Sequence, residues 1–306
     1  MSGLSVPRRV ALSLILAAAA WGVGTAISKR AVLEFPPLTL LPIQLAVSLV
    51  SLVLIMRWRR EHLRTGSVPA LLGRLGLLNP GLAYALSLLG LVQITASLSV
   101  LLWAVEPLMI LVLAALFLSE RVGRGVVLLS AIAIAGMTLV LWSPGGGGHV
   151  LGVLLTLAGV GSCAVYSVVT RRWLSTAGST IQVVVVQQAY ALVFAVLVLV
   201  GVALLGGRVW PTSLSVEGAL SVAASGLVYY GLAYSFYLYG LRHVPASIAA
   251  VSFYLIPVFG IAAGSLLGER FDGRQWIGAV VVIVAVSMVA WRTSIAVTEA
   301  SVTNSS

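Results

Sequence analysis

Long apolar stretches separated by short polar connectors run along almost the whole chain. A helix that spans the hydrocarbon core of a bilayer needs about 20 mostly apolar residues. By that measure the sequence predicts ten spanning helices, and the short connectors make consecutive helices antiparallel neighbours. Their approximate ranges are 10–33, 38–56, 70–90, 95–118, 122–142, 148–170, 180–205, 216–241, 245–268 and 273–291. The predicted fold is therefore an all-α integral membrane protein.

Composition and charge support this fold and suggest an orientation. Of the 306 residues 60% are hydrophobic and 8% are charged, whereas soluble domains average about 25% charged residues. With a cytoplasmic N-terminus and ten spans, 13 of the 18 basic residues fall on the cytoplasmic side. Because membrane proteins concentrate Lys and Arg on that side, we expect both termini to be cytoplasmic. The net charge of +10 thus reflects basic connectors, and no nucleic-acid partner is expected.

A series of motifs in the first half of the chain recurs in the second half. The segment Gly81-Leu82-Ala83-Tyr84 returns as Gly231-Leu232-Ala233-Tyr234 at a spacing of 150 residues. The further matches are Ala96-Ser97 with Ala246-Ser247, Pro107 with Pro257, Glu120-Arg121 with Glu269-Arg270, and Lys29-Arg30 with Arg171-Arg172. Five helices in each half make the second half enter the membrane from the opposite side. This construction is common in secondary transporters, and channels also use it.

The repeat predicts the domain organisation. We expect a first five-helix repeat over 1–144, a second, inverted repeat over 145–292, and a disordered cytoplasmic tail over 293–306. The two repeats would enclose a central cavity near the middle of the bilayer. A glycine run at 145–148 lies between them.

Each half also carries one longer motif: Ala-Ser, a mid-helix proline, a run of small residues ending in Glu-Arg, and a helix with spaced glycines. Its residues are Ala96, Ser97, Pro107, Glu120, Arg121, Gly125 and Gly136, and then Ala246, Ser247, Pro257, Gly268, Glu269, Arg270 and Gly278. On this motif nearly the whole chain resembles the drug/metabolite transporter superfamily in its EamA-type form. The resemblance implies ten helices, a central cavity lined mainly by helices one, three, four, six, eight and nine, and export of small metabolites. The aromatic-rich interior is similar to that of the YddG-type amino acid exporters of bacteria, which implies a bacterial inner membrane.

Aromatic residues near the middle of the predicted spans are candidates for substrate binding. Trp21, Trp103 and Phe253 lie near mid-bilayer, and the repeat relates Trp103 to Phe253. Stacking on an apolar or aromatic substrate and ordinary packing are both open for these rings.

Tyrosines of helices three and eight are further candidates. Tyr230, Tyr234 and Tyr237 have i, i+4 and i+7 spacing, which places them on one face of a helix. The deeper Tyr234 and Tyr237, with Tyr84 as the repeat counterpart of Tyr234, are candidates to line the cavity, with helix packing as the alternative. Tyr239 and Tyr229 are candidates for the interfacial belt of aromatic residues.

Helix four presents Ser99, Trp103 and Glu106 at the same spacing. Glu106 is the only acid well inside a predicted span, and an ionisable group at that depth should face a cavity or a partner. It is a candidate to bind a substrate ammonium group or to carry a proton, and a neutral, hydrogen-bonded carboxyl is the alternative. Lys29 is a candidate either for substrate contact or for a structural anchor near a helix end.

Other polar or helix-breaking residues lie within the spans. Pro107 and Pro257 each remove a backbone hydrogen bond, so they are candidate hinges for alternating access or static kinks. Gln187, Gln188 and Tyr190 in helix seven favour interhelical hydrogen bonds over a role in transport.

Motifs of catalysis and nucleotide binding are absent from the sequence, so we expect no enzyme, no cofactor and no metal site. The sequence predicts a secondary transporter that exports aromatic or apolar amino acids and similar small metabolites by alternating access. Its expected partners are the small-molecule substrate and the lipid bilayer, and we expect it to act as a monomer. A carrier for drugs or other metabolites and a passive channel are the alternatives.

Overall fold

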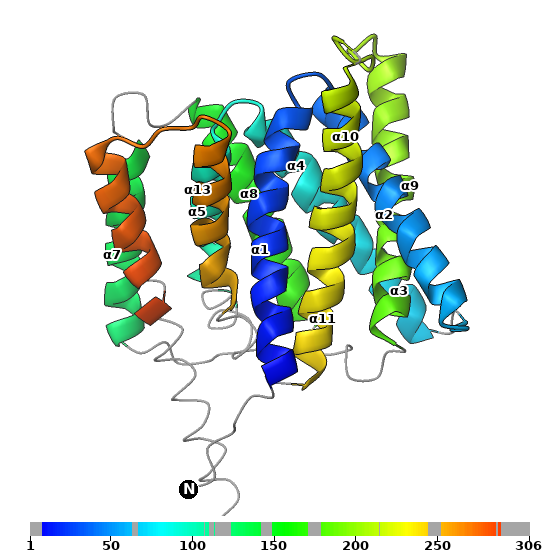
Figure 1. Ribbon diagram of the computed structural model, residues 1–306, viewed down its shortest axis with the longest axis horizontal. Coiled ribbons are helices and arrows are strands. Elements are labelled where there is room, and N and C mark those ends of the chain that lie inside the picture. Colours follow the sequence, from blue (N-terminus) through cyan, green and yellow to red (C-terminus); the bar gives the residue numbers. More distant parts are fainter. Residues whose placement is uncertain are drawn as a thin grey trace, which may run out of the picture.

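The computed structural model describes residues 8–62, 67–106, 108–109, 113, 124–141, 149–170, 179–213, 215–243, 252–285 and 287–288. Within these ranges the regular elements are helices. They run roughly side by side as one bundle, with α1 near its middle (Figure 1).

The first half of the chain contributes seven described elements. They are α1 (Arg8–Ala31), α2 (Pro37–Trp58), α3 (Ser67–Gly76), η1 (Leu77–Leu82), α4 (Ala83–Leu91), α5 (Ala96–Trp103) and α7 (Arg124–Leu141). The elements α3, η1 and α4 follow one another without a break and occupy the predicted third span.

The second half contributes a matching series. Its described elements are α8 (Val150–Thr170), α9 (Thr180–Leu204), α10 (Val216–Ser225), η3 (Gly226–Leu232), α11 (Ala233–His243), η4 (Ser252–Leu255) and α13 (Ile256–Leu266). A further apolar helix covers Gly273–Ala285.

Length and apolar character identify membrane-spanning helices in the described part of the chain. Five stretches qualify: Arg8–Ala31, Pro37–Trp58, Val150–Ser167, Thr180–Leu204 and Val216–Gly240. Large apolar side chains point outward on many of these helices, for example Leu54 on α2 and Leu197 on α9, which are 60% and 66% exposed. Lipid is the solvent that such a surface requires.

The helices that the sequence repeat pairs make reciprocal contacts. The helix α4 of the first half packs against α8, the first helix of the second half. In the same way, α11 of the second half packs against α1, the first helix of the first half. The pairs α2 with α9 and α5 with α13 join equivalent helices of the two halves. The two halves therefore interlock along the whole bundle instead of forming separate bodies.

A widened helical turn occurs at the same register in both halves. The elements η1 and η3 are π-helical and end at Leu82 and Leu232, directly before the repeated Ala-Tyr pairs. Asn79 inside η1 departs from helical geometry, with φ −145° and ψ 118°. π-helical turns rotate the residues that precede them relative to an ideal α-helix, and they often lie at functional sites.

Close helix crossings depend on glycine. A Cβ atom added at Gly278 would lie 2.6 Å from the backbone oxygen of Gly136, so α7 and the helix Gly273–Ala285 touch through their backbones. The two helices lie together at one side of the bundle, at the left in Figure 1.

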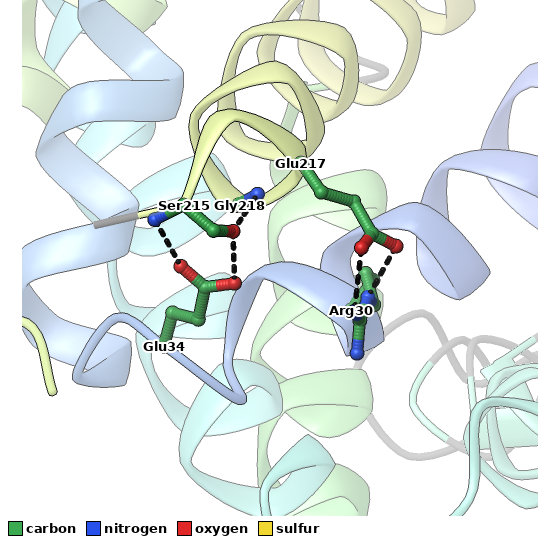
Figure 2. A network of polar contacts seen from close by, with 5 residues as sticks. All are labelled: Arg30, Glu34, Ser215, Glu217 and Gly218. Atoms are coloured by element: carbon green, nitrogen blue, oxygen red, sulfur yellow. Dashed lines mark hydrogen bonds and ion pairs between the residues drawn. The ribbon is translucent and has the colours of Figure 1, made fainter. Parts of the chain in front are cut away.

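Polar contacts tie the two halves together at the end of the bundle opposite the start of α1. Figure 2 shows the Arg30 guanidinium in a bidentate ion pair with Glu217, with both N···O distances 2.7 Å. Beside it, the Glu34 carboxylate accepts hydrogen bonds from the backbone N–H of Ser215 at 3.0 Å and from the Ser215 hydroxyl at 2.5 Å. The Ser215 hydroxyl also caps α10 by accepting from the N–H of Gly218. The connector after α1 thereby holds the first turn of α10.

Candidate functional site

A cavity lies between the two halves, and its described wall combines aromatic rings with one carboxyl group. Its lining comes from α1, η1, α4, α5, α8, η3, α11, η4 and α13, and the residue Glu106 that follows α5. The space between atoms at this site, including space open to solvent, is about 650 Å³. A largely apolar lining with a few polar groups is typical of small-molecule sites.

The structure brings together seven of the eight residues that the sequence suggests for substrate binding. These are Trp21, Tyr84, Trp103, Glu106, Tyr234, Tyr237 and Phe253. The eighth, Ser99, is 2% exposed in α5 and is not among the residues that line the cavity.

Four rings form one wall of the cavity. Trp21 on α1 meets Tyr234, Tyr237 and Phe253, with ring centroids 5.6, 5.4 and 5.5 Å apart. The rings of Tyr237 and Phe253 lie 4.8 Å apart. These distances are in the favourable range for aromatic pairs, so the four rings stabilise one another as a continuous aromatic surface.

Two tyrosines related by the sequence repeat meet across the cavity. The Tyr234 hydroxyl lies 3.0 Å from the Tyr84 hydroxyl and donates to the side-chain oxygen of Asn79 at 3.0 Å. Since Tyr84 and Tyr234 occupy equivalent positions, their contact marks where the two halves adjoin. Asn79 breaks the equivalence, because its repeat counterpart is Tyr229.

Glu106 lies in the polar part of the cavity. Its side chain is 6% exposed, and its carboxyl group faces the Ser167 hydroxyl at 3.4 Å and the Cys163 thiol, both on α8. Among the described residues that line the cavity, Glu106 is the only acid, and none is Lys, Arg or His. The site therefore offers one carboxyl group that the described lining leaves without a basic partner.

A hydrogen-bond donor in the cavity wall has no partner among the described residues. The indole Nε1 of Trp21 is buried and has no hydrogen-bond partner among the described residues. Buried donors are nearly always paired, so an unpaired one beside a cavity indicates a place for an acceptor on a bound molecule or for water.

Several lining residues escape the sequence analysis. They are Thr25, Asn79, Val100, Cys163, Tyr166, Ser167, Tyr229, Leu238 and Ile256. An Asn-Pro pair inside an apolar span is a signal for Asn79, because it interrupts a helix where a polar side chain needs a partner. The lining residues of α8 carry no comparable signal, since small and polar residues are common in membrane helices.

In the predicted eighth span, which comprises α10, η3 and α11, the tyrosines that face the cavity differ from the expected ones. Ideal spacing places Tyr230 with Tyr234 and Tyr237, yet Tyr229 lines the cavity and Tyr230 lies outside the lining, 1% exposed. The reason is η3, whose wider turn rotates the residues before Ala233 relative to those after it. The expectation of an interfacial position for Tyr229 is therefore wrong.

The structure also places the remaining candidates. Pro107 lies outside the described residues. Pro257 stands in the first turn of α13, where a missing N–H leaves no hydrogen bond unmade, so here it starts a helix. Lys29 donates to the carbonyl of Leu91 at 2.7 Å, which is the geometry of the structural anchor.

Two polar residues of the predicted seventh span, which is α9, form the expected interhelical hydrogen bonds. The side-chain oxygen of Gln187 accepts from the Tyr166 hydroxyl at 3.0 Å, and the Gln188 side chain donates to the Tyr230 carbonyl at 2.8 Å. Both predictions of interhelical hydrogen bonds are confirmed. Tyr190, in contrast, is 37% exposed.

Comparison with models of protein families gives two matches to the EamA-like transporter family. One covers residues 8–142 and the other covers residues 150–291. The family model therefore recognises each half of the chain separately, as the sequence repeat predicts.

Comparison with solved structures identifies the same fold elsewhere. One protein of known crystal structure is 20% identical to this chain, with a TM-score of 0.67, and the match covers 93% of this chain and 98% of the other. At that identity the likeness concerns the fold alone. The comparison with curated proteins gives no significant match.

Proposed function

Because this chain belongs to the EamA-like transporter family, whose members are membrane transporters of small metabolites, we propose that it exports amino acids with aromatic or apolar side chains. The observation that carries the proposal is the cavity itself. Among the described residues it combines an aromatic wall, a single carboxyl group and an indole donor without a partner. An amino acid of this class presents a matching apolar body, ammonium group and carboxylate.

Each part of such a substrate has a chemical counterpart in the cavity. The side chain packs on the rings of Trp21, Tyr237 and Phe253, where aromatic pairs add about 0.5–1.5 kcal/mol beyond buried area. The ammonium group pairs with Glu106 and is further stabilised by the surrounding ring faces. The substrate carboxylate accepts a hydrogen bond from the Trp21 Nε1–H. This neutral donor takes the place that a basic side chain would otherwise have.

A carrier for organic cations is the second candidate. The described cavity lining holds a carboxyl group and no Lys, Arg or His, so it is also suited to an amine that has no carboxylate. The difference between the two candidates is therefore whether the substrate must carry an acceptor for the indole donor.

We further propose that the chain spans the membrane ten times as a 5+5 inverted repeat and works by alternating access between its halves. The reciprocal packing of equivalent helices supports this arrangement. So does the direction of α8, the first helix of the second half. The His149 N–H that precedes α8 donates to the Gln93 carbonyl, close to the Leu91 carbonyl that Lys29 binds near the end of α1. The second half thus begins at the face where α1 ends.

The orientation and setting belong to the same proposal. The excess of Lys and Arg in one set of connectors supports cytoplasmic termini in a bacterial inner membrane. Repeats over 1–144 and 145–292 form a complete carrier in one chain, so the monomer suffices for transport.

Counterflow in proteoliposomes tests the function. Vesicles preloaded with phenylalanine, leucine or phenethylamine receive the same solute in labelled form, and uptake is compared with protein-free vesicles. A carrier for amino acids gives saturable counterflow of phenylalanine and leucine above that of phenethylamine. Transport of the amine alone would favour the organic-cation carrier, and flux that does not depend on preloading would indicate a channel.

A further inference from the structure

Two motifs of the sequence repeat bind one another at the face of the bundle opposite the start of α1. Glu269, which follows α13, accepts hydrogen bonds from the backbone N–H groups of Ala96 and Ser97 at 2.7 and 2.9 Å. The Ser97 hydroxyl donates to the same carboxylate at 2.6 Å. The Glu-Arg motif of the second half therefore caps the helix that begins with the Ala-Ser motif of the first half.

Lys29 on α1 makes a related contact at the end of α4, the helix that precedes α5. The Lys29 ammonium group donates to the carbonyls of Leu91 and Val92 at 2.7 and 3.4 Å, where α4 ends, and it is electrostatically attracted to Glu269. A cation at a helix C-terminus and an anion at a helix N-terminus both match the helix dipole. Together they hold the ends of α4 and α5 on either side of their short connection.

Side chains of α5 lie directly against glycines of α13 and close the seam between the two helices beside Glu269. A Cβ atom added at Gly264 would lie 2.5 Å from both the Ser97 hydroxyl and the Glu269 carboxylate, and one added at Gly260 would lie 2.6 Å from Val100. Ser97 and Val100 are 1% and 0% exposed. Solute cannot pass between two helices packed this closely.

The closed seam lies between Glu269 and the cavity. Along the chain from the capped end of α5, the residues Val100, Trp103 and Glu106 line the cavity in turn. A helical turn rises about 5.4 Å, so the cavity begins about one turn beyond the cap. Movement of the capped end would therefore displace side chains that line the site.

We propose that Glu269 is a latch that closes the cavity at this face and must release Ala96 and Ser97 in each transport cycle. The latch consists of Glu269 with the first turn of α5, and Lys29 supports it. A cap that only stabilises α5 would make the same contacts without controlling access to the cavity, so the test must measure access.

The chain contains its own probe of access. Cys163 is the only cysteine in the sequence, it lines the cavity, and its side chain is 7% exposed. A membrane-impermeant methanethiosulfonate reagent, added to one or the other face of oriented vesicles, reports whether the cavity is open to that face. The measurement needs no transported solute, so it distinguishes failure of the latch from failure of the proposed substrate.

Glu269→Gln removes the charge while it keeps the size and one acceptor. We expect Cys163 to react about 10-fold or more faster from the Glu269 face, because hydrogen bonds to a charged acceptor are lost. Ser97→Ala removes only one of them and should give about a 3-fold rise, which keeps the test open if Glu269→Gln folds poorly. Glu217→Gln is the matched control, since its partner Arg30 lies outside the latch. It should react as the unchanged protein does.

Three results would overturn the latch. The first is an unchanged rate from the Glu269 face in both variants. The second is an equal rise from both faces, which indicates general loosening of the bundle. The third is an equal rise in Glu217→Gln, which would assign the effect to surface charge.

Discussion

Replacing Trp21 by Phe removes one donor from the cavity and keeps an aromatic ring in place. The indole Nε1–H has no partner among the described residues, whereas the ring meets Tyr234, Tyr237 and Phe253 with ring centroids 5.4–5.6 Å apart. The phenyl ring retains most of this contact area. Trp21→Phe therefore isolates the contribution of the N–H to substrate recognition.

The expected magnitude follows from the charge of the acceptor. Hydrogen bonds that involve a charged group contribute about 1.5–3 kcal/mol, and 1.4 kcal/mol corresponds to about a 10-fold change in affinity. We expect the KM for phenylalanine to rise about 10- to 100-fold. For phenethylamine, which has no carboxylate, the KM should change less than about 3-fold. No described residue accepts a hydrogen bond from this N–H, so the thermal stability of the variant should not fall on that account.

Counterflow with each solute supplies the two KM values, and Trp103→Phe is the matched control. Trp103 lines the same cavity and contacts Tyr84 with ring centroids 5.6 Å apart. Its indole nitrogen differs from that of Trp21, because it does not belong to the buried polar atoms that lack a partner among the described residues. Its replacement should affect both solutes alike. An equal change for phenylalanine and phenethylamine in Trp21→Phe would refute the assignment of the indole as the carboxylate donor.

Three further changes test other parts of the structure. Glu106→Gln should raise the KM for both phenylalanine and phenethylamine about 10-fold, because both pair an ammonium group with the carboxylate; unchanged counterflow and pH dependence would exclude Glu106 from binding and proton transfer. The hydrogen bonds from the Ser215 hydroxyl and N–H lower the pKa of Glu34, so its contribution to stability is present above the unfolded pKa and is lost as pH falls through the lower folded pKa. Lowering the pH from about 6 to about 3 should accordingly reduce the Tm of the unchanged protein more than the Tm of Glu34→Gln. Thermal unfolding measures both Tm values, and parallel curves of Tm against pH would contradict this prediction. Gly278→Val should cost about 1–3 kcal/mol in thermal or denaturant unfolding, because its Cβ would meet the backbone of α7, whereas Gly201→Ala, with open space around it, should cost nothing.

The amino-acid sequence by itself determines the class of fold and its repetition. Apolar stretches of membrane-spanning length need no tertiary information, because the bilayer sets both their length and their composition. The repeated Gly-Leu-Ala-Tyr segment likewise aligns the two halves, and each half matches the family model. The candidate aromatic residues could be found in the same way, since large rings and a lone acid are conspicuous in the middle of apolar spans.

Only the tertiary structure decided which of those residues meet. Helical spacing selected Tyr230, whereas the π-helical turn η3 brings Tyr229 into the cavity, and no periodic rule anticipates the extra residue of such a turn. The binding of Glu269 to Ser97 joins motifs 172 residues apart, so the sequence shows both motifs but not their contact. That no described residue accepts from the Trp21 indole N–H is likewise a property of the packed site. Patterns along the chain record what each helix requires of the bilayer, whereas the chemistry of the cavity arises from contacts between helices.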